Sequence, residues 1–201
     1  MERTAFIQRI QKALHRHGDK PTEVPPALLE PLETWDAEAL IEPFTTELEA
    51  VGGVVHQVDD IAAARERLKE IMARLEPASY LCSSDPIVDE VLSAVSIPMA
   101  DNPADADIGI SGVIFAIAAT GSILLSSEYG RQASLLPMNH VAVVRVSQLV
   151  PTLAEAIEAR GGHLPSAWVQ ATGPSRTADI ELTLSTGVHG PGVAHVILVR
   201  D

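Results

Sequence analysis

The chain has 201 residues, 46% of them hydrophobic and 20% charged, and its formal net charge is −13. This length and composition suit one globular domain with a small additional segment. The acidic balance argues against nucleic-acid and anionic-membrane partners, because both require clustered Lys and Arg. The apolar runs are too short to cross a bilayer and the N-terminus is charged throughout, so the sequence predicts a soluble cytoplasmic protein.

Cysteine and histidine usage limits the metal chemistry expected of this chain. The single cysteine, Cys82, cannot form an intramolecular disulfide, and an iron–sulfur cluster typically needs about four cysteines. The seven histidines show neither an HExxH pattern nor paired Cys/His spacing, so no metal site is expected. Any iron–sulfur cluster would therefore belong to a partner protein.

Residues 1–43 are predicted to form a helix followed by a proline-rich acidic arm. Apolar side chains recur at helical spacing from Thr4 to His15, and Gly18 ends that pattern. Residues 21–49 then hold eight acids and no base, interrupted by prolines. The apolar side chains of the arm need burial, either on its own domain, which we favour, or along a second subunit.

Residues 44–201 alternate helix and strand signals, which predicts a mixed α/β domain. Amphipathic spacing and helix stops predict helices over residues 44–51, 61–75, 87–95 and 151–160. Short apolar or β-branched runs predict strands over residues 54–58, 80–82, 123–126, 140–146, 167–171, 180–185 and 195–200. The apolar run that precedes Thr120 is compatible with either helix or strand.

Three loops repeat one pattern, an apolar run followed by Thr-Gly and a polar or proline-containing turn. They are Thr120-Gly121-Ser122, Thr172-Gly173-Pro174-Ser175 and the segment TGVHGP at residues 186–191. In α/β sheets, ligands bind outside the carboxyl ends of strands, where glycine lets backbone N–H groups approach an anion and hydroxyl groups add donors. Each loop alone could be an ordinary tight turn, whereas the three together favour a shared anion pocket.

The segment TGPSRTADIE, residues 172–181, carries the densest set of polar groups. Arg176 is a candidate bidentate contact for an anion, and Asp179 or Glu181 could accept a proton or orient the arginine. Alternatively, Ser175 or Thr177 caps a short helical turn, and such a helix start would itself attract an anion. The cap and the binding site are compatible interpretations.

Other charged and ionisable residues near these loops are also candidates. Arg131 and Arg176 both lie beside glycine and hydroxyl residues, where an anion contact and a surface ion pair are equally good interpretations. His189 is the best candidate general acid or base, because its glycine-lined loop gives it access to a ligand. His195 begins a strand, which favours a structural role.

Several familiar catalytic signatures are absent from the sequence. It contains no GxSxG elbow, no GxxxxGK[ST] loop and no GxGxxG fingerprint. Serine hydrolysis, NTP hydrolysis and dinucleotide-dependent hydride transfer are therefore disfavoured. Small-anion binding and a less familiar acid/base chemistry remain.

Four motifs in sequence, IAATGSILLSS, RQASLLPMNHVAVV, TGPSRTADIE and GVHGP, resemble the LUD domain of lactate utilization, and more closely its lactate-utilization protein C (LutC) type. The resemblance covers about residues 80–201. It implies a three-layer αβα sandwich of the NagB/RpiA/CoA-transferase-like kind, here preceded by the helical arm. It also implies an accessory subunit without a cofactor of its own, in a complex that oxidises L-lactate to pyruvate and whose partner proteins carry iron–sulfur clusters.

The resemblance also marks positions, although no catalytic assignment comes with them. The family's characteristic positions in this chain are Thr120, Gly121, Arg131, Pro137, His140, Thr172, Gly173, Pro174, Ser175, Arg176, Asp179, Glu181, His189, Gly190 and Pro191. The predicted binding residues for a small anionic ligand are Thr120, Gly121, Ser122, Arg131, His140, Thr172, Gly173, Ser175, Arg176, Thr177 and Gly190. The candidate catalytic residues are His189, Asp179 and Glu181.

One position departs from the family pattern, because an acidic residue commonly precedes Thr-Gly and this chain has Ala119. If that acid serves in chemistry, its absence favours a binding or accessory role; if it is structural, nothing follows. The alternative function is a stand-alone enzyme acting on a sugar phosphate or CoA ester, which rests on fold analogy. Related folds use a catalytic glutamate, for which Glu128 and Glu181 are only nearby candidates.

Overall fold

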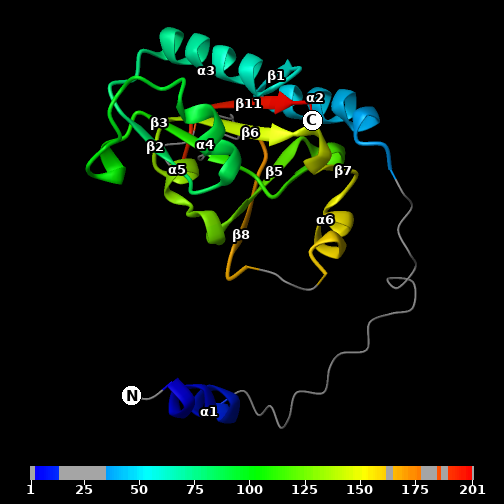
Figure 1. Ribbon diagram of the computed structural model, residues 1–201. Helices are drawn as coiled ribbons and strands as arrows, with labels where there is room; N and C mark the ends of the chain where they lie inside the picture. Colours follow the sequence, from blue (N-terminus) through cyan, green and yellow to red (C-terminus); the bar gives the residue numbers. More distant parts are fainter. Residues whose placement is uncertain (1–2, 14–34, 162–164, 178–184, 187–189, 201) are drawn as a thin grey trace. The chain divides into compact units, whose positions relative to one another are not determined.

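The computed structural model of the chain describes residues 3–13, 35–161, 165–177, 185–186 and 190–200 (Figure 1). The chain divides into two compact units, Met1–Glu33 and Thr34–Asp201. The first unit contains helix α1 (Arg3–Ala13), which confirms the helix expected there. Within the described part of the chain, no helix has both the length and the apolar character needed to span a membrane.

A parallel sheet of five strands forms the centre of the second unit, in the order β1-β11-β6-β3-β2. Each neighbouring pair is parallel. The inner strands are nearly continuous runs of buried residues, as expected for strands covered on both faces. The bounds are β1 (Val54–Val58), β2 (Tyr80–Cys82), β3 (Ile108–Gly112), β6 (Asn139–Arg145) and β11 (Val193–Val199).

Helices α3 (Ile61–Leu75) and α4 (Pro86–Leu92) cover one face of the central sheet. The side chain of Asp60 caps α3 by accepting a hydrogen bond from the Ala63 N–H at 2.7 Å. Leu68 of α3 packs in one apolar cluster with Ile110 and Ile197 of the sheet. The periodic apolar stripe of α3 thus has the partner that its sequence requires.

Helix α2 (Ile41–Ala50) and a second, four-stranded sheet cover the other face. The small sheet has the order β7-β4-β5-β8, and β5 is antiparallel to both β4 and β8. Its strands are β4 (Phe115–Ile117), β5 (Ser122–Ser126), β7 (Leu149–Val150) and β8 (Trp168–Ala171). Helix α6 (Leu153–Ala159) packs on the outer side of this sheet. Figure 1 shows α3 above the central sheet, with β5, β8 and α6 below it.

These layers confirm the predicted α/β class, with an outer layer that combines α2 with the small sheet. The apolar run before Thr120, compatible with either state, forms strands β3 and β4. The remaining short elements are η2 (Glu38–Leu40), η3 (Pro103–Asp105), η4 (Ala118–Thr120), η5 (Ser127–Tyr129), α5 (Gln132–Leu135), η6 (Val146–Gln148), β9 (Arg176–Thr177) and β10 (Ser185–Thr186).

A helical turn capped by Ser175 is contradicted by the structure, whereas the residues that would follow a cap at Thr177 lie outside the described residues. Residues 176 and 177 form strand β9, which pairs in antiparallel fashion with β10. The backbone groups of these two residues therefore find partners across a two-stranded ladder instead of along a helix. The predicted strand at residues 180–185 lies outside the described residues except for its last position.

Gly121 holds the small sheet against α2. Its φ is +59°, and a Cβ at this position would lie 2.2 Å from the backbone N of Leu48. The Leu48 side chain is 2% exposed and belongs to the cluster that joins α2, the small sheet and the central sheet. Only a residue without a side chain allows the two backbones to approach so closely.

We predict that Gly121→Ala lowers the free energy of unfolding by about 3 kcal/mol, from a positive φ and from overpacking against α2. The matched control is Gly161→Ala, because Gly161 has φ +55° but nothing within 4 Å of its added Cβ. The control should lose only about 1 kcal/mol. Urea denaturation measures the unfolding free energy of both variants, provided that their m-values equal that of the parent. Equal losses of unfolding free energy in the two variants would contradict the close packing of Gly121 against α2.

Candidate functional site

Two of the three Thr-Gly loops meet because β4 and β8 run in the same direction. Both strands are antiparallel to β5, which lies between them, so their carboxyl ends reach the same edge of the small sheet. Thr120 follows β4, Thr172 follows β8, and Ser122 begins β5 at that edge. The convergence that the repeated pattern predicted is therefore present for these two loops.

A chain of hydroxyl groups joins the two loops. The Ser122 Oγ lies 2.7 Å from the Thr120 Oγ1 and 2.7 Å from the Thr172 Oγ1, and it accepts a hydrogen bond from Gln170 Nε2 at 3.1 Å. A serine hydroxyl offers one donor and two acceptor positions, so these three contacts use all of them. Ser122, which is fully buried, organises the loops, whereas Thr120 and Thr172 are exposed and can contact a ligand.

The third loop lies against the second one. The N–H of Ser175 donates to the carbonyl of Pro191 at 2.7 Å, and Thr177 pairs with Ser185 across the β9–β10 ladder. A Cβ added to Gly190, whose φ is +84°, would lie 3.5 Å from the Cβ of Ser175. The candidate catalytic residues lie outside the described residues: His189, Asp179 and Glu181.

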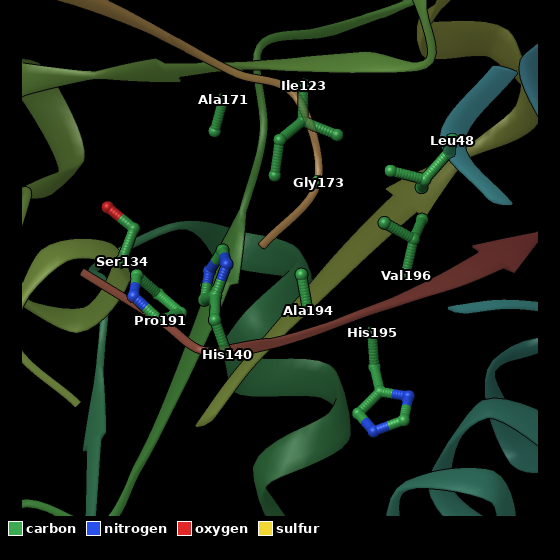
Figure 2. A pocket seen from close by; sticks show the side chains of 10 residues that line it. All are labelled: Leu48, Ile123, Ser134, His140, Ala171, Gly173, Pro191, Ala194, His195 and Val196. Atoms are coloured by element: carbon green, nitrogen blue, oxygen red, sulfur yellow. The ribbon is translucent and has the colours of Figure 1, made fainter. Parts of the chain in front are cut away.

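A small pocket with a volume of about 40 Å³ lies between these loops and the central sheet (Figure 2). From the predicted set it includes His140 and Gly173, and Pro191 of the family positions also lines it. The complete lining is Leu48, Ile123, Ser134, His140, Ala171, Gly173, Pro191, Ala194, His195 and Val196. The His195 ring points away from the pocket (Figure 2), and apart from His140 the other lining residues are apolar or carry a single hydroxyl, so a ligand here would meet apolar surface and few polar groups.

The pocket is not at the carboxyl end of the central sheet, where ligands of α/β folds commonly bind. His140 is the second residue of β6, and Pro191 and Ala194 flank the beginning of β11. Strands of the central sheet thus contribute their amino ends. Only the small sheet presents the carboxyl end of a strand to the pocket, through Ala171 and Gly173 at the end of β8.

Among the described residues of the predicted set, His140 is the one ionisable side chain that projects into this pocket. It is 3% exposed, and Figure 2 shows its imidazole projecting from β6 toward Ala171 and Gly173. Its Nε2 lies 2.8 Å from the Ser111 Oγ. Burial lowers the pKa of His140 from 6.5 to about 4, so the imidazole is neutral at neutral pH. A neutral imidazole can donate or accept one hydrogen bond but cannot balance an anionic charge.

Sequence reasoning missed Ser111 and Ser134, two buried hydroxyl residues beside His140. Ser111 lies on β3, next to β6, and the Ser134 Oγ donates to the carbonyl of Arg131 at 3.0 Å. A signal for Ser111 was present, because Gly109 and Ser111 alternate with Ile108 and Ile110 along the strand. Small or polar residues on one face of an otherwise apolar strand indicate a close contact or a polar partner on that face.

The two candidate anion-binding arginines do not line the pocket. Arg176 is exposed and its Nη2 donates to the carbonyl of Val51 at 2.7 Å, at the end of α2. A cation is favourable there because the last carbonyls of a helix lack intrahelical partners and carry partial negative charge. Arg131 is exposed at the beginning of α5. Arg176 thus joins the second loop to α2, and its contact with an anion stays a prediction.

Two further positions from the sequence have defined surroundings. Glu128, a nearby candidate for a catalytic glutamate, forms an ion pair with Arg160 at 2.9 Å and is not part of the pocket lining. Ala119 is exposed, and its N–H donates to the carbonyl of Pro151 at 3.0 Å. An acidic side chain at position 119 would therefore face solvent beside Thr120.

We predict that neutral His140 makes stability pH-dependent. Because its pKa is lowered in the folded state, its contribution is present above about pH 6.5 and is lost as the pH falls toward about 4. Between these limits it accounts for about 3 kcal/mol of unfolding free energy. His140→Gln should remove this part of the slope in urea denaturation at successive pH values. An identical slope in the parent and the variant would contradict the assignment.

Comparison with known proteins relates the chain to one family. A model of the LUD domain matches residues 41–199. Over 104 residues the chain is 40% identical to lactate utilization protein C of Bacillus subtilis, an alignment that covers 48% of this chain and 43% of that protein. Over 158 residues it is 34% identical to lactate utilization protein C of Geobacillus kaustophilus, covering 75% of this chain and 64% of that protein. The alignments thus span between 43% and 64% of the length of these relatives.

One solved structure shares the fold. A DUF162 family protein from Deinococcus radiodurans superposes with a TM-score of 0.61 over 83% of this chain and 99% of that chain. The sequence identity of this pair is 20%. At that level the likeness concerns the arrangement of helices and strands alone.

Proposed function

The chain belongs to the LUD domain family, and on that premise we propose that it acts in lactate utilization as an accessory subunit of an L-lactate-oxidising system. Relatives that carry the name lactate utilization protein C support this role. Oxidation of L-lactate to pyruvate removes two electrons and two protons. With one cysteine this chain cannot supply the thiolates of an iron–sulfur cluster, so cluster-bearing partner proteins would receive the electrons.

The observation that carries the ligand part of the proposal is the meeting of the Thr-Gly loops over a pocket that contains His140. Lactate and pyruvate each have a carboxylate, an oxygen on the adjacent carbon and a methyl group. The hydroxyl of Thr172 and the backbone beside Gly173 are suitable donors for a carboxylate. Ile123 and Ala171 offer apolar surface for the methyl group.

His140 suits the second oxygen of such a ligand. Its imidazole is neutral because burial lowers its pKa to about 4, so it can hydrogen-bond the hydroxyl of lactate or the keto oxygen of pyruvate without forming an ion pair. The charge of the carboxylate would then be met by hydroxyl and backbone donors. Arg176, which is exposed and donates to the carbonyl of Val51 at the end of α2, is the predicted cation of the same loop.

We predict that L-lactate or pyruvate stabilises the isolated chain, by about 2.7 kcal/mol at 100 times the dissociation constant. Thr172→Val removes one donor at nearly constant volume and should weaken binding about tenfold, the effect of one lost hydrogen bond to a charged group. Thermal unfolding in the presence of each ligand measures both effects.

Thr46→Val is the matched control, because Thr46 is exposed on α2, whereas Thr172 stands between Ala171 and Gly173, which both line the pocket. Its response to ligand should equal that of the parent. Absence of stabilisation by either ligand, or an unchanged response of Thr172→Val, would contradict the ligand part of the proposal while leaving the partner part open to its own test.

The partner part predicts that the chain copurifies with cysteine-rich iron–sulfur proteins when they are expressed together, and that deletion of residues 19–33, the part of the acidic arm that precedes the second unit, weakens this association. Failure to associate, together with unchanged growth on lactate when the protein is lost, would contradict the accessory role. Turnover of a sugar phosphate or CoA ester by the isolated chain would favour the stand-alone enzyme instead.

A further inference from the structure

A second polar cluster lies on the opposite face of the central sheet. Side chains alternate along β11, so that Ala194 and Val196 line the pocket described above while the ring of His195 lies on the other side of the strand (Figure 2). There its Nδ1 is 3.1 Å from the Nε2 of His56, and its Nε2 is 3.1 Å from the Nη2 of Arg74. The three side chains come from β11, β1 and α3.

The contact with Arg74 fixes the direction of these hydrogen bonds. A guanidinium group can only donate, so the Nε2 of His195 is the acceptor. Neutral His195 then carries its proton on Nδ1 and donates it to the Nε2 of His56. Neutral His56 in turn carries its proton on Nδ1, which leaves one imidazole N–H that is not used within the cluster.

Both histidines are neutral at neutral pH. Burial, followed by the charges of His56 and Arg74, lowers the pKa of His195 to about 4. Burial, followed by the charges of Arg67 and Arg74, lowers the pKa of His56, and Glu70 opposes this shift. The guanidinium of Arg74 thus faces a neutral ring, and no ion pair joins it to a carboxylate within the described part of the chain.

A surface pocket with a volume of about 170 Å³ adjoins this cluster, lined by His56, Arg67, Glu70, Ile71 and Arg74. The Arg67 Nη1 pairs with the Glu70 Oε2 at 2.6 Å. The Arg67 Nε is nevertheless buried and has no hydrogen-bond partner among the described residues. A buried donor without an acceptor is costly, and native structures contain few of them.

These observations have one thing in common: the cluster has more hydrogen-bond donors and positive charge than acceptors to match them. The lining has two guanidinium groups against one carboxylate, its side-chain donors belong to Arg67, Arg74 and His56, and the buried Nε–H of Arg67 is a donor without a partner among the described residues. These three side chains come from α3 and β1. We propose that this pocket binds a small, multiply charged oxyanion of the phosphate type, independently of the site between the Thr-Gly loops.

The chemistry of the site favours a phosphate group over a monocarboxylate. A carboxylate has two oxygens in one plane, whereas a phosphate presents oxygens in several directions and a second negative charge. The donors of this pocket come from α3 and β1 and therefore approach from different directions, which matches the oxygens of a phosphate group. The pocket lies at the surface, so both free phosphate and the phosphate group of a larger molecule are suitable ligands.

The experiment uses the full chain and follows its histidine imidazole signals by NMR while inorganic phosphate replaces chloride at constant ionic strength. The signals of His56 and His195, identified with His56→Gln and His195→Gln, should shift in a saturable manner. A parallel titration with glycerol phosphate distinguishes the sources, because equal affinity indicates recognition of the phosphate group and weaker affinity indicates a site for the free ion. Absence of a saturable shift with either compound would overturn the proposal.

Matched variants separate specific binding from general attraction. Arg67→Gln removes a lining cation without touching the contact between Arg74 and His195, and should weaken phosphate binding at least about tenfold. Lys69→Gln removes the same charge from the same helix but outside this lining, and should bind as the parent does. Equal affinity in the two variants would overturn the proposal.

A pH series with sulfate, which stays doubly charged over the range used, gives a further test. The groups that face His56 are His195, Arg67, Glu70 and Arg74, and a bound anion adds negative charge to this set. Because that charge favours imidazolium, binding raises the pKa of His56, and sulfate should bind more tightly at about pH 5.5 than at about pH 8. An affinity that is the same at both pH values would exclude His56 from the site.

Discussion

The contact between the Thr-Gly loops and the carboxyl end of α2 is the constraint on which the rest of the site depends. Gly121 approaches the backbone of Leu48, and a Cβ on Gly173 would lie 2.7 Å from the side chain of Val51. Arg176 adds a hydrogen bond to the carbonyl of Val51. Because these atoms are already in close contact, the loops cannot shift relative to α2. Helix α2 therefore fixes the position of the loops and of the pocket between the loops and the sheet.

The central sheet separates two chemically different regions. On the side of α2, the pocket combines apolar residues with His140, which burial keeps neutral. On the side of α3, the side chains around His195 carry guanidinium groups. Because successive residues of a strand point to opposite faces, one residue of β11 separates the two environments. The same alternation allows each region to change in sequence without altering the other.

The sequence predicted the regular elements best where local signals agree. Strand β1 and helix α3 have the predicted bounds because a β-branched run and a capped amphipathic stripe specify them locally. The small sheet could not be anticipated in the same way, because β4 and β7 have only three and two residues and their pairing depends on the surrounding layers. Similarly, the contact of Arg176 with the carbonyl of Val51 could not be predicted, because every residue type has a backbone carbonyl. His140 could be named but its neutrality could not, since burial of the ring is a property of the fold.

The hydroxyl chain across the two loops has a consequence for what a ligand meets. Ser122 accepts from Gln170, so it donates to one of its two threonine neighbours and accepts from the other. The threonine that receives this proton keeps its own hydrogen to offer outward, while its counterpart presents only lone pairs. Rotation of the three hydroxyl groups about their C–O bonds exchanges the roles of the two threonines without displacing a heavy atom. The exposed hydroxyl groups of the two loops therefore always include one donor, and a molecule bound beside them decides which threonine supplies it.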